Sequence, residues 1–202
     1  QGAGKKAGPV VSAVPGPART FESVLIRQCA PTLAGLKPGS IFCVKFLDSE
    51  SVQQKVRQWD KKLSPRGLSA QVLLKRPDSM LIYIYRKKHL EQILFQRDYQ
   101  QFLRESGYSN ANLDGLLAQL ILRLRTRPEF PHEIGVFLGY PLEDVIGFIE
   151  NHGQNFTCCG FWKSYSDPAE IQACFDRYRR CIHIYTILFE QGIPIERLAV
   201  SA

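Results

Sequence analysis

Cysteine thiols and the imidazole of His132 are the groups in this sequence best suited to chemistry. The cysteines stand at positions 29, 43, 158, 159, 174 and 181. No two of them have Cys-x-x-Cys spacing, which argues against a zinc ribbon or a thioredoxin-type dithiol. If Cys29, Cys158, Cys159, Cys181 and His132 met in space, they could bind a soft metal or an iron–sulfur centre, or perform thiol redox chemistry.

Packing is the alternative role for several of these residues. Cys174 and Cys181 fall on an apolar stripe of helical spacing, and buried thiols usually behave as small hydrophobic groups. Cys158 and Cys159 are adjacent, so in an extended segment their side chains point to opposite sides and at most one faces the core. His132 precedes Glu133, which could serve as its carboxylate partner or could begin a helix whose dipole favours an acidic residue.

Aromatic and basic residues of the second half could line a pocket for a planar ligand. The candidates for this pocket are Tyr140, Trp162, Lys163, Tyr165 and Tyr178. Filling of a hydrophobic core is the commoner use of such aromatic side chains, so that alternative stays open. No phosphate-binding glycine-rich loop, Ser-His-Asp arrangement or His-Glu-x-x-His motif is present.

The segment 130–150 also has the spacing of a helix-turn-helix, with glycines at 135 and 139 and apolar residues at 145 and 148. Its second helix would begin with Glu143 and Asp144 and end with Glu150, and carboxylates repel phosphates. We therefore interpret the spacing as packing geometry, and keep DNA binding as an alternative.

Three strands and a series of helices must position these residues. The strands are expected at 40–47, 68–75 and 80–86, the last being central because it is apolar on both faces. Helices are expected at 21–30, 49–63, 89–95, 97–106, 110–126, 131–138, 141–152 and 168–191. Pro31 is expected to end the first helix, Ser49 to cap the second and Pro168 to open the last. Residues 157–165 are expected to be extended.

These elements predict an α+β fold, with a small, mostly antiparallel sheet from residues 40–86 covered by helices and a helical C-terminal half. Residues 1–20 are expected to be a disordered N-terminal tail, because they are rich in Gly, Ala and Pro without apolar periodicity. Residues 21–198 are expected to form a single domain. No segment is apolar for long enough to insert into a membrane.

Positive charge is concentrated in the first half of the chain. Residues 1–101 hold 17 Lys and Arg against 7 Asp and Glu, whereas residues 102–202 hold 9 against 12. A basic half suits nucleic acid or another polyanion, although a solvated lysine-rich surface is the simpler interpretation.

The stretch from His132 to Cys181 resembles an uncharacterised bacterial family catalogued as domain of unknown function 3793. The residues that carry this resemblance are the His-Glu-Ile-Gly and Leu-Gly-Tyr-Pro stretches that begin at 132 and 138, and the Gly-Phe-Trp-Lys stretch at 160. The segments 29–37 and 83–88 are also similar, so the resemblance covers about residues 21–190. It implies a protein of anaerobic bacteria and no established reaction.

Three hypotheses for the function follow. The first is a cytoplasmic accessory protein with a thiol- or metal-centred redox site. The second is a module that binds nucleic acid or another polyanion through the basic half. The third is a non-catalytic interaction domain with a protein or small-molecule partner. A cytoplasmic location is expected, because reduced thiols are usual there.

Overall fold

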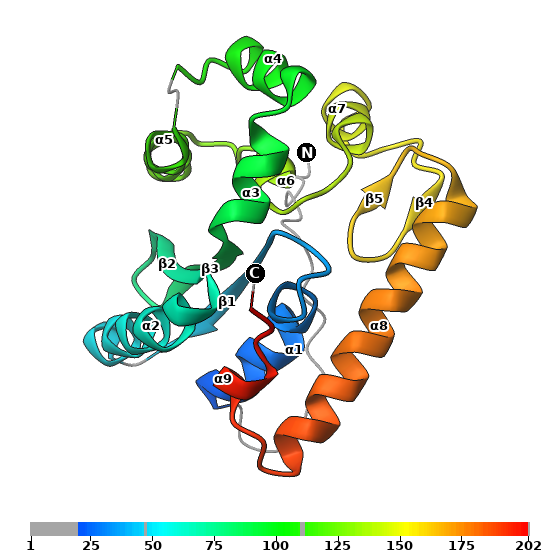
Figure 1. Ribbon diagram of the computed structural model, residues 1–202. Coiled ribbons are helices and arrows are strands. Elements are labelled where there is room, and N and C mark those ends of the chain that lie inside the picture. Colours follow the sequence, from blue (N-terminus) through cyan, green and yellow to red (C-terminus); the bar gives the residue numbers. More distant parts are fainter. Residues whose placement is uncertain (1–19, 47, 110–111, 202) are drawn as a thin grey trace, which may run out of the picture.

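The computed structural model describes residues 20–46, 48–109 and 112–201, so the N-terminal tail expected at 1–20 lies outside the described residues except for Thr20. Figure 1 shows the order of the elements. The helices are α1 (Phe21–Leu33), α2 (Ser49–Leu63), η1 (a 3-10 turn, Ser64–Arg66), α3 (Lys87–Leu94), α4 (Arg97–Glu105), α5 (Leu113–Thr126), α6 (Ile134–Phe137), α7 (Leu142–Glu150), α8 (Pro168–Glu190) and α9 (Ile195–Leu198). The strands are β1 (Gly39–Lys45), β2 (Leu68–Lys75), β3 (Ser79–Arg86), β4 (Cys158–Cys159) and β5 (Lys163–Ser164).

Strands β1, β2 and β3 form an antiparallel sheet in the order β1-β3-β2, as the sequence predicts. Ile84 of β3 pairs with Ser40 on one side and with Ala70 on the other. A hairpin joins β2 to β3 and is closed by the Arg76 amide, which donates to the Ser79 carbonyl at 2.8 Å. The α+β prediction is confirmed.

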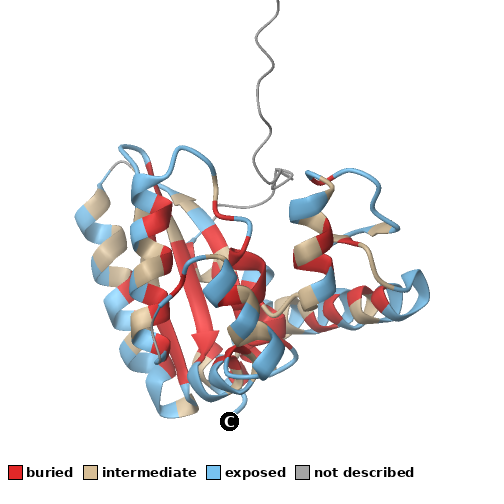
Figure 2. Cartoon of the chain, turned by 90° about the horizontal axis from the view of Figure 1, so that it is seen from above, coloured by how far each residue is buried: buried red, intermediate tan, exposed pale blue. Residues whose placement is uncertain are grey.

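Both faces of the central strand are buried (Figure 2). Met80, Ile82 and Ile84 belong to a hydrophobic cluster with residues of α1, α2 and α9. Tyr83 and Tyr85 face the opposite way, into a cluster with residues of α3 to α7. Alternation of side chains along a strand therefore divides the core into two parts that share the sheet.

Helix α1 does not end at Pro31 but continues for two further residues. The amide of Leu36 donates to the Pro31 carbonyl at 2.8 Å, and the amide of Gly35 donates to the Thr32 carbonyl at 3.2 Å. This is a Schellman ending, with Gly35 in the left-handed conformation at φ +78°. The helix thus ends at the glycine, because a proline in the last turn removes only one internal hydrogen bond.

The caps of the other long helices follow from single side chains. Asp48, and not Ser49, caps α2, and its carboxylate accepts from the amides of Glu50 and Ser51. Asp167 caps α8 and Pro168 occupies its first position, as predicted. Residues 157–165 form a hairpin in which Cys158 pairs with Ser164.

Among the described residues, no helix combines the length and the apolar character needed to cross a lipid bilayer.

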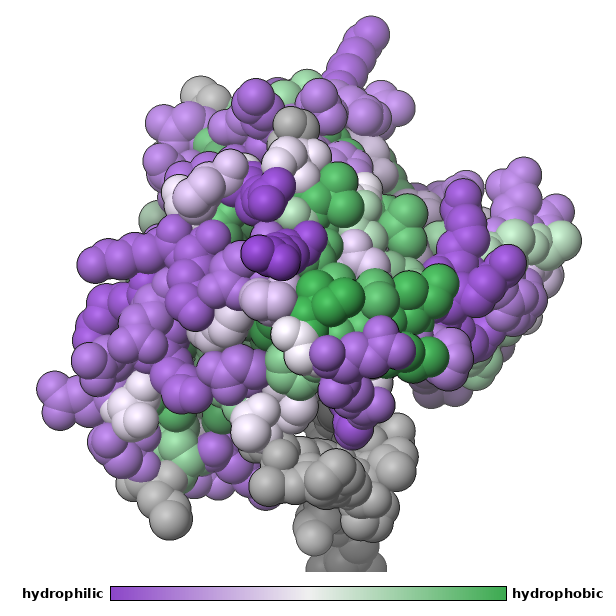
Figure 3. All heavy atoms as spheres, turned by 60° about the horizontal axis from the view of Figure 1, so that its bottom comes forward, coloured by the Kyte–Doolittle hydropathy of each residue, from purple (hydrophilic) through white to green (hydrophobic). Residues whose placement is uncertain are grey.

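Figure 3 shows apolar side chains gathered at the surface of the face that it displays. The large apolar side chains that the C-terminal half exposes include Ile184 and Ile187 of α8.

Candidate functional site

The cysteines and the histidine singled out in the sequence do not form a metal centre among the described residues. Within those residues, no three His, Cys, Asp or Glu side chains are placed so that they could hold a metal ion. Cys29 and Cys181 are buried on α1 and α8, whereas Cys159 is exposed on β4. The half-buried Cys158 has its sulfur 4.0 Å from Oε1 of Gln172.

His132 and Glu133 point to different surroundings, because they are adjacent on a turn. The exposed ring of His132 lies 4.9 Å from that of Phe148. Glu133 is buried, and its carboxylate accepts from Arg123 Nη1 at 2.9 Å and from the Tyr108 hydroxyl at 3.4 Å. Glu133 therefore holds α6 to α5 and is not a partner of the imidazole.

Three of the five aromatic-pocket candidates lie together. The rings of Tyr140 and Trp162 are stacked, with centroids 4.6 Å apart, and Trp162 lies 6.4 Å from Tyr178. The other two candidates face elsewhere: Lys163 Nζ donates to the Gly153 carbonyl at 2.8 Å, and the Tyr165 hydroxyl donates to the Gln154 carbonyl at 2.7 Å.

Trp162 is held in place by the buried carboxylate of Asp144, to which its Nε1 donates at 2.7 Å. The same carboxylate accepts from the side chains of Ser164 and Ser166 and from the backbone amides of Tyr165 and Ser166. Burial acts to raise the pKa of Asp144, but these hydrogen bonds outweigh it and keep the pKa below its usual value. Asp144 thereby fixes the hairpin, and with it the tryptophan, against α7.

A lysine that the sequence predictions missed completes this cluster. Lys37 is only 7% exposed, and its Nζ lies 5.4 Å from the ring centroid of Tyr140 and 5.9 Å from that of Tyr178. The thiols of Cys29 and Cys174 are close enough to influence its pKa. We call this group the Lys37 site; it consists of Lys37, Cys29, Tyr140, Trp162, Cys174 and Tyr178.

Two turns bring Lys37 and Tyr140 together. The Schellman ending of α1 includes Lys37, whose amide donates to the Pro31 carbonyl at 3.3 Å. Gly139 precedes Tyr140 at φ +74°, and a Cβ there would lie 2.2 Å from Cδ of Pro38. The two turns can touch only because residue 139 is a glycine.

The buried Arg86 anchors the first of these turns. Its Nε donates to the Thr32 carbonyl at 2.6 Å, and its Nη2 donates to the carbonyls of Leu33 at 2.5 Å and Val200 at 2.8 Å. Its backbone amide donates to the Pro38 carbonyl at 2.8 Å. The end of β3 therefore fixes the backbone on both sides of Lys37.

Within the described residues, no carboxylate pairs with Lys37 and its Nζ forms no hydrogen bond. In the part of the chain that the structure describes, no buried side-chain nitrogen or oxygen lacks a hydrogen-bond partner. The tip of Lys37 must therefore still touch solvent, although the rest of the side chain is enclosed. Lys37 is therefore an almost fully enclosed amine that keeps some contact with solvent.

Burial lowers the pKa of Lys37 from 10.5 to about 8, against the opposing influence of the two thiols. Burial likewise raises the pKa of Tyr140 to about 12 and holds the pKa of Tyr178 above its usual value. It raises the pKa of Cys29 far above 9.0. At neutral pH the Lys37 site thus contains protonated phenols, a protonated thiol at Cys29 and an amine that loses its proton readily.

Comparison with protein families matches the family described as "Protein of unknown function (DUF3793)" over residues 25–199. The chain belongs to the DUF3793 family. Comparison with curated proteins finds no match, and comparison with solved structures finds none either. The match includes every residue of the Lys37 site.

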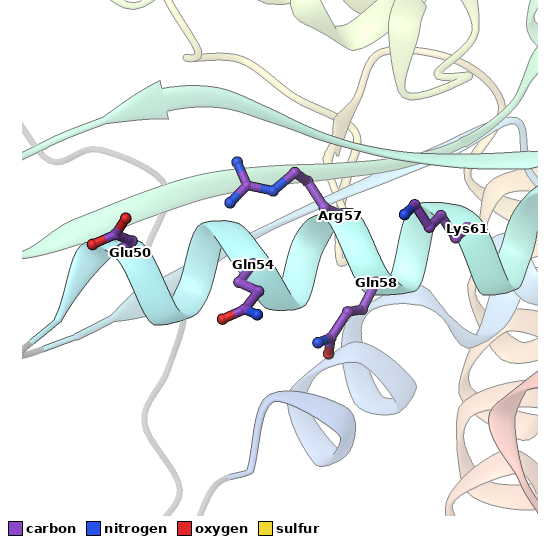
Figure 4. A pocket seen from close by; sticks show the side chains of 5 residues that line it. All are labelled: Glu50, Gln54, Arg57, Gln58 and Lys61. Atoms are coloured by element: carbon purple, nitrogen blue, oxygen red, sulfur yellow. The ribbon is translucent and has the colours of Figure 1, made fainter.

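Two hollows on the surface of this DUF3793 chain are lined by residues outside the Lys37 site. One of about 520 Å³ is lined by side chains of a single helix, α2 (Figure 4): Glu50, Gln54, Arg57, Gln58 and Lys61. Another of about 360 Å³ lies beside His132 and Arg127. Neither is lined by a buried amine, so neither matches the Lys37 site as a place for a ligand.

The helix-turn-helix spacing of the DUF3793 chain is explained by packing. Gly135 is buried, and a Cβ there would lie 2.7 Å from Val145. A Cβ on Gly147 would lie 2.6 Å from the Tyr165 ring. The residues that α7 exposes include Glu143 and Glu150, whose charges oppose a nucleic-acid backbone. This segment supports the walls of the Lys37 site.

One signal in the sequence pointed toward Lys37, namely the family-like segment 29–37 that it ends. Periodicity cannot find such a residue, because Lys37 lies in a connector and the rings over its Nζ belong to Tyr140 and Tyr178, which lie 103 and 141 positions further along the chain.

Proposed function

We propose that this DUF3793 protein binds a small planar ligand whose carboxylate or carbonyl oxygen accepts a hydrogen bond from the Lys37 amine. The observation that carries the proposal is a buried lysine without a carboxylate partner among the described residues. A buried charge is normally paired, because removing it from water is costly. A ligand oxygen would supply the missing acceptor.

The aromatic side chains around the amine favour a flat ligand. Tyr140 and Tyr178 present their ring faces to Nζ, and Trp162 stacks on Tyr140. Such rings offer apolar area for a planar group while the amine orients its polar end. Lys37 is only 7% exposed, so a ligand that reaches Nζ must be small or must present a slender end.

The site in this proposal is centred on an amine, and thiols only line it. It therefore differs from the first hypothesis, in which a thiol or a metal is the reactive centre. Cys29 lies beside Lys37, but burial raises its pKa, so the thiol stays protonated and is a poor nucleophile or metal ligand at neutral pH. The six cysteines are free in the structure, which supports the proposal of a reducing, cytoplasmic location.

Fluorescence of Trp162 provides a direct test of binding. The chain has two tryptophans, Trp59 and Trp162, so a Trp59→Phe background leaves the reporter that stacks on Tyr140. Pyruvate and acetate are suitable probes, because both are small and carry planar oxygen acceptors. We expect saturable changes in emission with either probe.

Two lysine substitutions in that background separate the site from its surroundings. Lys37→Met is expected to abolish the saturable response. Lys163→Met is the matched control, since Lys163 also lies over an aromatic ring, at 4.9 Å from Phe156, but donates to a backbone carbonyl. An unresponsive parent protein, or equal responses in the parent and Lys37→Met, would contradict the proposal.

A further inference from the structure

The Lys37 amine has the surroundings of a nucleophile as well as those of a hydrogen-bond donor. Two aromatic rings and two thiols surround Nζ, and no carboxylate among the described residues pairs with it to hold it protonated. Lysines that form covalent adducts with carbonyl compounds are typically desolvated in this way. The Nζ atom is enclosed but keeps some contact with solvent, because no fully buried side-chain nitrogen of the described residues lacks a hydrogen-bond partner, and a slender carbonyl compound could approach it there.

The supply of unprotonated amine supports the same inference. With the pKa of Lys37 at about 8 instead of 10.5, the neutral fraction at about pH 7 rises by about 300-fold. Chemistry that needs a neutral amine should therefore select Lys37.

We propose that the ligand of the Lys37 site is an aldehyde or ketone, and that Lys37 captures it reversibly as an imine. This inference rests on the proposed function and specifies the class of its ligand. It requires no metal and no co-reactant other than the carbonyl compound.

The bonds and protons of this step balance without a further reagent. The Nζ lone pair attacks the carbonyl carbon, the carbonyl oxygen takes a proton and one N–H proton is released, which gives a carbinolamine. The nitrogen then loses its second proton while the carbon–oxygen bond breaks and the oxygen leaves as water. Tyr140 and Tyr178 remain protonated, because burial raises the pKa of both phenols.

Reductive trapping tests the inference on the full chain. The protein is incubated at about pH 7 with pyruvate and sodium cyanoborohydride, which reduces an imine to a stable secondary amine. Peptide mapping by mass spectrometry then locates each adduct. The expected product carries the mass of pyruvic acid less one oxygen atom at Lys37, formed at least ten times faster than at any other lysine.

Substitutions and a matched compound make every outcome informative. Lys37→Met should remove the fast adduct, and Lys163→Met should retain it. If a variant does not fold, peptide mapping of the parent protein still shows whether the fast adduct is on Lys37. Lactate, which lacks the ketone, should leave no adduct. Adducts spread over exposed lysines, without preference for Lys37, would overturn the imine.

Binding and trapping fail in different ways. If pyruvate alters Trp162 fluorescence saturably but is never trapped on Lys37, the proposed binding site stands and the imine is refuted. If pyruvate neither binds nor is trapped, both proposals fail.

Discussion

Replacing Lys37 with methionine is expected to stabilise the fold at neutral pH, although the lysine lies in the core of the candidate site. Methionine has a similar length and fills the same space without a charge. A lysine kept at this position only for packing would show the opposite result. The substitution therefore separates a role in function from a role in stability.

The magnitude follows from the pKa of Lys37. Folding lowers this pKa from 10.5 to about 8, and at 1.36 kcal/mol per unit the buried ammonium costs about 3 kcal/mol below pH 8. The two ring contacts at 5.4 and 5.9 Å stabilise the cation and are lost in the variant. The net gain for Lys37→Met at about pH 7 is therefore roughly 1–3 kcal/mol.

The pH dependence of the stability difference between Lys37→Met and the parent protein is more diagnostic than its size at neutral pH. The folded protein releases the Lys37 proton near pH 8 and the unfolded chain near 10.5, so the unfolded state binds more protons in between. The free energy of unfolding of the parent protein therefore rises across this pH window. Lys37→Met lacks the titrating amine, so its free energy of unfolding does not show this rise. The difference between them should shrink by about 2 kcal/mol from about pH 7 to about pH 9.5.

Urea unfolding at these two pH values measures the effect. The comparison stops at about pH 9.5, because unfolded tyrosines ionise near pH 10 and destabilise both proteins above it. Lys163→Met is the control, and loss of its hydrogen bond to the Gly153 carbonyl should destabilise the protein by about 1 kcal/mol. A Lys37→Met protein that is less stable than the parent by the same amount at both pH values would refute the reasoning.

Further substitutions and reagents test the walls of the site. Asp144→Asn should lower the free energy of unfolding by about 2–3 kcal/mol and alter Trp162 fluorescence, because it turns an acceptor of several hydrogen bonds into a partial donor. An unchanged urea unfolding curve would contradict this role of Asp144. Gly139→Ala should cost about 1–3 kcal/mol in thermal or urea unfolding, owing to its positive φ and its contact with the neighbouring turn, and a neutral effect would mean that the turns can separate. A thiol reagent should modify the exposed Cys159 rapidly and the buried Cys29 only on unfolding, and fast labelling of Cys29 would show that α1 opens.

Much of the fold could be predicted from the sequence, because its signals are local. The alternation of β3, apolar on both faces, identified it as the central strand. The Asp167-Pro168 pair placed the start of α8 correctly. Pro31 misled the prediction of where α1 ends, because a proline in a last turn is tolerated when a glycine ending follows.

The candidate site was only partly accessible to the same reasoning. Aromatic residues in the second half suggested a pocket, and the structure brings Tyr140, Trp162 and Tyr178 together. The amine that gives this cluster its chemistry lies on a loop in the first half. Its burial depends on two turns meeting at Gly139 and Pro38, a contact between residues 101 positions apart, and no spacing rule reports such a contact.

The titration of Lys37 itself tests the central claim most directly. In protein with 13C-labelled lysine, the Cε resonances can be followed by NMR from about pH 6 to about pH 11, and Lys37→Met assigns the resonance. We predict that the Lys37 resonance titrates with a pKa of about 8. A Lys37 resonance that titrates near 10.5 would contradict a buried, unpaired amine, and with it the proposed site.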